Sequence, residues 1–249
     1  MRQHTKSSKK QTVRRIIVSA AILLLLVGLL GVFLLKGTGR VPTKLRSILH
    51  ITLPYGAAQD VAWTPAVPDD GVWNLQLVNP WNEIPNGYSP ALTTLSNGQS
   101  VDERIYPALQ AMFDTMRQEN VCPIVVSGYR TQDYQQGLLD DEITKYENEG
   151  YSAEAAATVA KTWVAVPGTS EHQLGLAVDI GADTTKSTDE EVYTWLAENA
   201  YRFGFILRYP EDKTALTGIS YEPWHYRYVG VEAAAKIYRS GICLEEYLG

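Results

Sequence analysis

The sequence has little cysteine and histidine, and it lacks the common nucleotide-binding motifs. Two cysteines, Cys122 and Cys243, are too few for a cysteine-rich structural zinc site. They could pair in an oxidising compartment or remain two buried thiols, and the sequence leaves both possibilities open. Neither G-x-G-x-x-G nor a P-loop occurs, so nucleotide chemistry has no support, and the helical H-E-x-x-H motif of many zinc proteases is also missing.

Acidic residues are absent before Asp60, and this absence divides the 249-residue chain. Ten of the 22 basic residues lie in the first fifth: Arg2, Lys6, Lys9, Lys10, Arg14, Arg15, Lys36, Arg40, Lys44 and Arg46. The remaining 12 are outnumbered by all 28 acidic residues, so the rest of the chain carries a net charge of about −16. A surface of that sign repels nucleic acid. The basic N-terminal segment is more typical of the flank of a membrane span.

An uncharged, mostly aliphatic run of 20 residues covers positions 16–35. As a helix, at ~1.5 Å per residue, it would span the ~30 Å hydrocarbon core of a bilayer. A cleaved signal peptide is the alternative, but its apolar region is usually shorter, roughly 7–15 residues. We therefore expect a basic cytoplasmic tail (1–15), a retained single transmembrane anchor (16–35), a linker rich in turn formers (36–70) and an extracytoplasmic domain (71–249).

The expected domain alternates short strand and helix patterns without an internal repeat. Apolar residues at helical spacing predict a helix from about Asp102 to Gln118, and a capping-box pattern at Thr188–Glu191 opens a helix that extends to about Tyr201. Further helices are expected over 131–146, 153–163 and 231–239, and short strands over 73–78, 124–126, 176–180, 205–209 and 224–229. This irregular alternation predicts an α+β fold, with a small, mainly antiparallel sheet and flanking helices.

Two segments of this domain combine a histidine with nearby carboxylates. Ser170–Asp179 reads S-E-H-Q-L-G-L-A-V-D, and Glu222–Tyr228 reads E-P-W-H-Y-R-Y. Of the four histidines in the chain, only His172 and His225 lie in the domain. A catalytic zinc ion takes three protein ligands from imidazole and carboxylate groups and leaves a fourth position for water. His172, Asp179 and His225 are therefore a candidate ligand set.

Glu222 lies three residues before His225 and is the candidate general base. A carboxylate beside the metal, but not bound to it, can take the proton of the attacking water and pass it to the leaving amine. The alternative is that each histidine and its neighbouring carboxylate form a structural pair. Spacing alone leaves these two interpretations about equal.

A third segment, Ser127–Thr131, reads S-G-Y-R-T and is followed by Gln135. It leaves a predicted buried strand through a glycine turn, a position at which loops often present functional groups. Arg130 could bind a substrate carboxylate or stabilise the oxyanion of a tetrahedral intermediate. A structural arginine that caps a helix or pairs with an acid is the alternative.

Together, the three segments resemble the VanY-type D-alanyl-D-alanine carboxypeptidases, zinc peptidases that carry S-G-Y-R-[ST], S-x-H-x-x-G-x-A-x-D and E-x-W-H-x-R-[YF]-V-G in this order. Ser127–Thr131, Ser170–Asp179 and Glu222–Gly230 match these patterns. The resemblance covers roughly residues 71–249 and implies the small α+β fold shared with hedgehog signalling domains.

The same resemblance implies a site and a reaction. The implied zinc ligands are His172, Asp179 and His225, with Glu222 as catalytic base and Arg130 as a catalytic and substrate-binding residue. Further substrate contacts are expected from Ser170, Gln135 and Ser127. The implied reaction removes the C-terminal D-alanine from a peptidoglycan stem peptide. An L,D-carboxypeptidase acting on tetrapeptide stems, and a non-catalytic wall-binding module of the same fold, are the alternatives.

Overall fold

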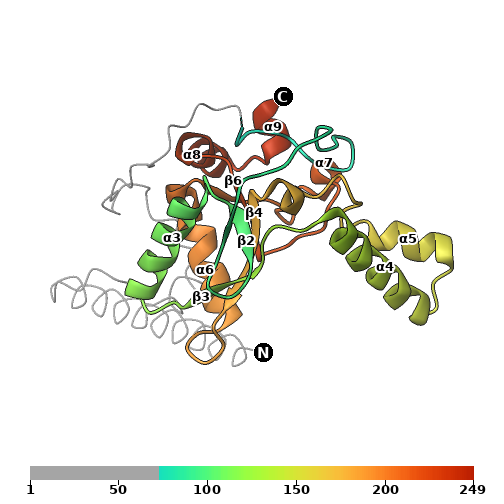
Figure 1. Cartoon of the computed structure of the whole chain (residues 1–249), viewed down its shortest axis with the longest axis horizontal. Coiled ribbons are helices and arrows are strands. Elements are labelled where there is room, and N and C mark those ends of the chain that lie inside the picture. The colour runs from blue at the N-terminus through green and yellow to red at the C-terminus, as the bar shows by residue number, and fades with distance from the viewer. Residues whose placement is uncertain (1–72) are drawn as a thin grey trace, which may run out of the picture. The chain divides into compact units, whose positions relative to one another are not determined.

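The computed structural model describes residues 73–249, which form two small antiparallel sheets surrounded by helices (Figure 1). The predicted α+β fold is therefore confirmed. The expected tail, anchor and linker (residues 1–15, 16–35 and 36–70) lie outside the described residues. Among residues 73–249, no helix combines the length and the apolar character needed to cross a membrane.

The larger sheet has four strands, and neighbouring strands are antiparallel throughout. Their order is β3 (Pro123–Ser127), β4 (Ala177–Ala182), β6 (His225–Tyr228) and β5 (Phe205–Leu207). In the register of this sheet, Asp179 on β4 lies opposite both His225 on β6 and Ser127 on β3. Directly opposed residues share a face of the sheet. The register therefore places Asp179 beside one of the predicted zinc-binding histidines.

Helices cover the face of this sheet that lies opposite to Asp179 and His225. The helices α3 (Tyr106–Gln118) and α6 (Asp189–Asn199) join Val178 and Ile180 in one buried cluster. Because side chains alternate along a strand, Asp179 points away from that cluster. The predicted capping box at the start of α6 is present: Thr188 Oγ1 accepts from Glu191 N, and the Glu191 carboxylate accepts from Thr188 N.

A small hairpin fixes the loop that follows β3. It consists of β1 (Leu92–Thr94) and β2 (Ser100–Asp102). The Ser100 carbonyl accepts a hydrogen bond from Tyr129 N at 2.6 Å, and a Cβ atom on Gly128 would lie only 2.2 Å from the same oxygen. Position 128 therefore requires glycine, since any side chain would push the loop off the hairpin.

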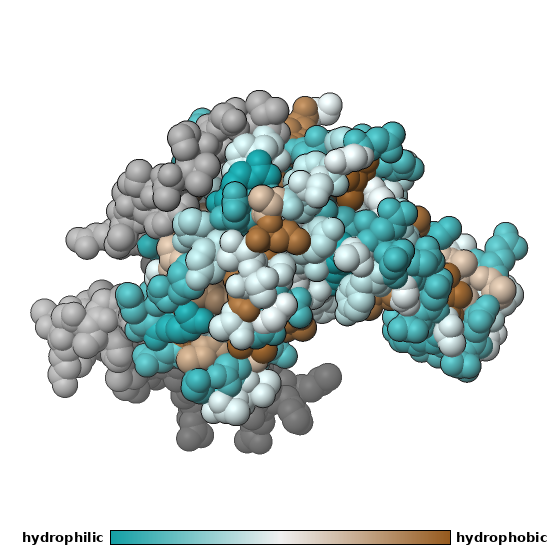
Figure 2. Space-filling view, in the orientation of Figure 1, coloured by the Kyte–Doolittle hydropathy of each residue, from teal (hydrophilic) through white to brown (hydrophobic). Residues whose placement is uncertain are grey.

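Two helices, α4 (Gln132–Asn148) and α5 (Ala153–Ala160), pack against each other and project from the sheet (Figure 1). The face of this helical hairpin visible in Figure 2 is mainly hydrophilic. The chain returns from the hairpin to a short 3₁₀ helix, η1 (Glu171–Leu174). Both ends of the hairpin therefore lead directly to predicted site residues.

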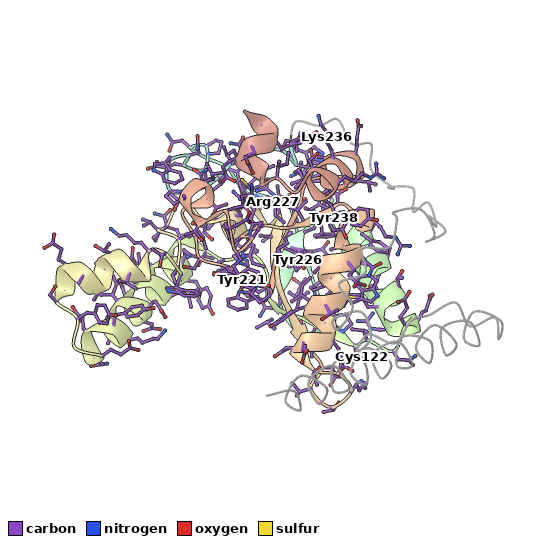
Figure 3. The ribbon with its side chains drawn as sticks, turned by 180° about the vertical axis from the view of Figure 1, so that it is seen from behind. Cys122, Tyr221, Tyr226, Arg227, Lys236 and Tyr238 are labelled. Atoms are coloured by element: carbon purple, nitrogen blue, oxygen red, sulfur yellow. The ribbon has the colours of Figure 1, made fainter. Side chains whose placement is uncertain are left out.

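Four short elements remain. They are η2 (Ala200–Phe203), α7 (Thr214–Thr217), α8 (Val231–Ser240) and α9 (Leu244–Leu248). Of these, η2 and α8 pack against β5. Helix α8 ends at Ser240 and is followed by Gly241, whose positive φ of 64° is readily adopted by glycine. Both cysteines are free thiols. Cys243 immediately precedes α9, and Cys122 lies far from that helix (Figures 1 and 3).

Some predicted boundaries are wrong. The segment 73–78 forms turns and irregular chain instead of a strand. The carbonyls of Asn74 and Gln76 accept hydrogen bonds from Arg227 Nη2, at 3.0 and 2.8 Å, in place of the backbone partners that a strand would have. The first helix does not begin at Asp102, which belongs to β2; it begins at Tyr106, as Pro107, a residue that favours the first helical turn, predicts. Helix α5 ends at Ala160, before the predicted end at residue 163.

Candidate metal centre and active site

Three side chains from separate segments converge on one point. His172 lies in η1, Asp179 in β4 and His225 in β6, and one ligand atom from each lies within 4.8 Å of the others. Asp179 Oδ1 is 3.3 Å from His172 Nε2 and 3.2 Å from His225 Nδ1. Gly175, with a φ of 73°, turns the chain between η1 and β4. The local structure therefore brings the three predicted ligands together.

The spacing of these atoms fits a zinc ion. Ligands at ~2.0–2.1 Å in a tetrahedral site lie ~3.3 Å from one another, which agrees with the 3.2 and 3.3 Å separations here. His172 Nε2 and Asp179 Oδ1 are buried, and neither has a hydrogen-bond partner among the described residues. Buried polar atoms without a partner are uncommon. A divalent cation would satisfy both.

The outer atoms of two ligands are fixed by other groups. His172 Nδ1 lies 2.7 Å from the Gly128 carbonyl, which can only accept, so Nδ1 carries the proton and Nε2 faces the site with a lone pair. Burial lowers the pKa of His172 to about 4, against the pull of Asp179. Burial opposes ionisation of Asp179, but the neighbouring imidazoles outweigh it and hold its pKa well below the usual range. At neutral pH His172 is therefore neutral and Asp179 is ionised, and both are in the form that binds a cation.

Glu222 lies beside this cluster without joining it. Its Oε2 is 3.5 Å from His225 Nδ1, and only 7% of the residue is exposed. A turn places the two side chains together, since His225 N donates to the Glu222 carbonyl at 3.2 Å. Burial, with a further contribution from the Asp179 charge, raises the pKa of Glu222 to about 7. A carboxylate with this pKa can both accept and release a proton near neutral pH.

Arg130 contacts a predicted zinc ligand. Its Nη2 donates to Asp179 Oδ2 at 2.5 Å, its Nε to Ser127 Oγ at 2.9 Å, and its Nη1 to Gln135 Oε1 at 3.4 Å. Gln135 is itself held by a 2.8 Å bond from its amide to the Ala165 carbonyl. The pairing with an acid, which the sequence left open as the structural alternative, is therefore present.

A cavity of about 460 Å³ opens onto the cluster. Three of the four predicted substrate contacts line it, namely Arg130, Gln135 and Ser170, whereas Ser127 lies behind Arg130. The sequence did not single out the aromatic walls, Trp163, Tyr209 and Trp224. Of these, only Trp224 falls within a motif, and nothing in the sequence marked the other two.

The comparisons with known proteins agree with this geometry. The model of the family described as VanY, D-alanyl-D-alanine carboxypeptidase, matches residues 98–231. The chain belongs to the VanY family. Over 180 residues it is 60% identical to a D-alanyl-D-alanine carboxypeptidase of Enterococcus faecalis, covering 72% of this chain and 67% of that protein. Over 190 residues it is 37% identical to the putative carboxypeptidase YodJ of Bacillus subtilis, covering 70% and 66%.

Solved structures of VanY proteins are also similar. VanYB in complex with D-alanine-D-alanine shares 61% identity and a TM-score of 0.70, covering 71% of this chain and 97% of that one. A VanY D,D-pentapeptidase variant in complex with Zn(II) shares 60% identity and the same TM-score of 0.70, covering 71% and 99%. The LD-carboxypeptidase LdcB is more distant, at 35% identity and a TM-score of 0.58, covering 69% and 84%.

Proposed function

We propose that this VanY-family chain is a zinc-dependent D,D-carboxypeptidase that removes the C-terminal D-alanine from peptidoglycan stem peptides. The observation that carries the proposal is the set of three buried ligand atoms within 4.8 Å of one another, with Glu222 beside them in the wall of a cavity. The complex of VanYB with D-alanine-D-alanine supports the substrate class.

In this mechanism His172, Asp179 and His225 hold the zinc ion. When bound, zinc would polarise the scissile carbonyl and lower the pKa of water, so that water gives up a proton readily and becomes a nucleophile at neutral pH. Glu222 accepts the proton of the attacking water and then donates it to the amine of the departing D-alanine. The pKa of about 7 holds for the metal-free protein. The positive charge of a bound cation would lower it, which favours the carboxylate form that accepts the first proton.

Arg130 serves two partners in this proposal. Its Nη2 is committed to Asp179, but Nη1 makes only a long bond of 3.4 Å to Gln135. Because Arg130 lines the cavity, Nη1 is well placed to bind the C-terminal carboxylate of a substrate. Gln135 and Ser170 line the same cavity and are proposed as polar contacts to the peptide.

Release of D-alanine from two peptides tests the function. The purified zinc-loaded protein is incubated with a pentapeptide stem that ends in D-Ala-D-Ala and with a tetrapeptide stem whose D-alanine follows an L-centre. We expect release from the pentapeptide. Release from the tetrapeptide alone would indicate the L,D-carboxypeptidase activity of the LdcB type, and release from neither would favour a wall-binding module.

We further propose that residues 16–35 anchor the enzyme in the cell membrane with the catalytic domain outside the cytoplasm. Support comes from the length of the apolar run and the basic residues around it. A cell-wall substrate lies on that side. A reporter that is active only outside the cytoplasm, fused after residue 249, should be active, and an inactive reporter would contradict the proposed topology.

A further inference from the structure

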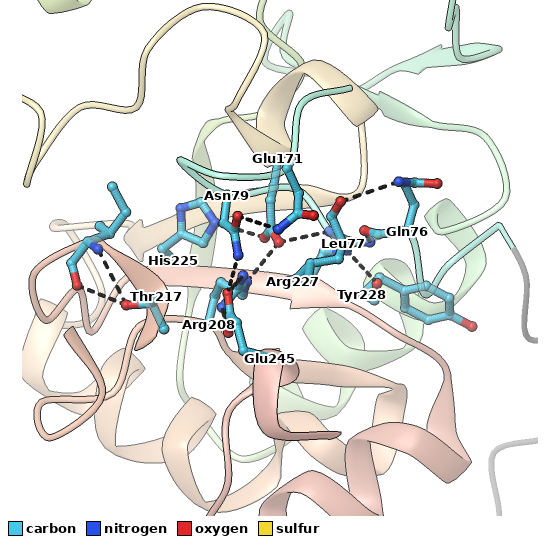
Figure 4. A network of polar contacts seen from close by, with 12 residues as sticks. Gln76, Leu77, Asn79, Glu171, Arg208, Thr217, His225, Arg227, Tyr228 and Glu245 are labelled. Atoms are coloured by element: carbon cyan, nitrogen blue, oxygen red, sulfur yellow. Dashed lines mark hydrogen bonds and ion pairs between the residues drawn. The ribbon is translucent and has the colours of Figure 1, made fainter. Parts of the chain in front are cut away.

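A buried polar network lies behind His225 (Figure 4). Its centre is Glu171, whose side chain has no exposed surface. Arg208 Nε donates to Glu171 Oε1 at 2.7 Å, and Arg227 Nη1 lies 2.9 Å from the same oxygen. Arg208 also donates two hydrogen bonds, of 2.9 and 2.6 Å, to the carboxylate of Glu245 in α9. The network joins the segment that carries His172 to the C-terminal helix.

Stability alone explains this network poorly, because replacing a buried ion pair with apolar residues is often neutral or stabilising. Its geometry suggests a more specific role. Both arginines contact Oε1, so the carboxylate cannot rotate without losing them. Its other oxygen, Oε2, points toward His225 Nε2 at 3.8 Å. Within the described part of the chain, neither of these two buried atoms has a hydrogen-bond partner.

In the other two candidate ligands, the atom that faces away from the metal position has a hydrogen-bond partner, whereas the corresponding atom of His225 has none among the described residues. The outer nitrogen of His172 is bonded to the Gly128 carbonyl, and the outer oxygen of Asp179 is bonded to Arg130. His225 must present Nδ1 as a lone pair to bind a metal, which puts its proton on Nε2. Glu171 Oε2 is the acceptor that Nε2 faces. Outer partners of this kind set the tautomer and orientation of a metal-binding histidine.

We propose that Glu171 is a positioning residue for the metal centre: its Oε2 accepts the Nε2–H of His225, so that Nδ1 faces the zinc ion as a lone pair. The inference rests on the zinc site of the proposed function. A hydrogen bond of ordinary length requires the two atoms to approach by about 1 Å from their present 3.8 Å. Arg208 and Arg227 act through Glu171 by holding Oε2 toward His225.

Glu171→Gln is the informative substitution, because it keeps the shape and reverses the hydrogen bond. Arg208 and Arg227 can only donate, so the amide oxygen of the glutamine must take the place of Oε1. The amide NH₂ then faces His225 Nε2 and donates to it. The proton of His225 moves to Nδ1, the atom that should bind zinc.

Glu245→Gln is the matched control. It changes the other carboxylate that Arg208 contacts, leaving Glu171 and His225 untouched. Zinc affinity is measured for the full-length wild type and both variants by competition with a chelator, and unfolding temperature is measured without metal. We expect Glu171→Gln to weaken zinc binding about 10–100-fold and Glu245→Gln to leave it nearly unchanged. An affinity loss that is equal in both variants, or absent from Glu171→Gln, would overturn the proposal.

The wild-type protein provides a second measurement, which stands even if Glu171→Gln does not fold. In the zinc-loaded protein, nitrogen NMR of the histidine rings should show His172 protonated at Nδ1 and His225 at Nε2, with the His225 proton shifted downfield and slow to exchange. A fast-exchanging His225 proton would refute the bond to Glu171. These readouts do not depend on D-alanine release. Loss of that activity alone would therefore count against the proposed function and not against this inference.

Discussion

Arg130 and Asp179 share a 2.5 Å hydrogen bond on the side of the carboxylate that faces away from the two histidines. One oxygen of Asp179 is thereby occupied by a guanidinium, and the other is left for the metal position. The arrangement favours binding of the metal through a single oxygen. A residue expected from sequence to contact substrate thus also supports a metal ligand.

The first prediction concerns Arg130→Lys. A lysine amine cannot reproduce the planar fork that bonds Asp179 and Ser127 together. We expect about a 10–100-fold loss of zinc affinity, together with a higher KM for the peptide. Arg117→Lys is the matched control, since Arg117 forms an exposed pair with Asp114. A raised KM with unchanged zinc affinity would restrict Arg130 to substrate binding.

The second prediction separates the base from the ligands. Glu222→Gln should lower kcat by about 10²–10⁴-fold, because a general base contributes about that much. Zinc content should remain stoichiometric, since Glu222 lies outside the three-residue cluster. Metal analysis and D-alanine release on the same preparation check both points. Undiminished turnover would remove Glu222 from the mechanism.

The third prediction uses the pH dependence of the metal-free protein. Burial raises the pKa of Glu222 from 4.5 to about 7, so the folded state binds this proton more tightly than the unfolded state. The contribution of this group to the stability of the wild type should therefore be lost as pH rises through this range. Relative to its value near pH 4, the stability advantage of Glu222→Gln should grow by roughly 3 kcal/mol at pH 8.

Thermal unfolding of both proteins in chelator at several pH values measures this difference. His225 Nδ1 lies 3.5 Å from Glu222 Oε2 and the two charges affect each other, so the difference between the two curves reports the titration of this coupled pair. If the two stability curves run parallel from pH 4 to pH 8, the carboxyl of Glu222 is not shifted upward by burial.

The fourth prediction tests the hairpin contact at Gly128. A Cβ at this position would lie 2.2 Å from the Ser100 carbonyl, so Gly128→Ala must displace the loop whose carbonyl accepts from His172. We expect a destabilisation of about 1–3 kcal/mol and weaker zinc binding. Gly137→Ala is the control, because Gly137 lies within α4 with no atom near its Cβ position. That variant should be stabilised by roughly 0.5–1 kcal/mol.

Much of the site could be predicted from the sequence because its parts lie in short motifs. The S-x-H-x-x-G-x-A-x-D segment contains a candidate metal ligand, a glycine turn and a second candidate ligand within ten residues, and the local structure follows from that spacing. Similarly, the spacing of apolar residues in 106–118 was enough to predict α3. Short sequence patterns predict those parts of the structure whose residues are close together in the sequence.

The polar network behind His225 could not be predicted in this way. Arg208 lies 37 residues from Glu171 and 37 from Glu245, and neither separation corresponds to a helix or strand period. The wrong strand at residues 73–78 has the same origin, since its carbonyls are satisfied by the side chain of Arg227 more than 150 residues away. These contacts exist only once the sheet has formed.

The contact between Arg208 and Glu245 also bears on how the chain tolerates truncation. A premature stop codon that removed residues 242–249 would take away less than one twentieth of the protein and no residue that touches the cavity. It would nevertheless leave the guanidinium of Arg208, fully enclosed in the intact protein, without the acid that receives two of its hydrogen bonds. Such an allele should behave as a null, with little folded enzyme recovered from cells.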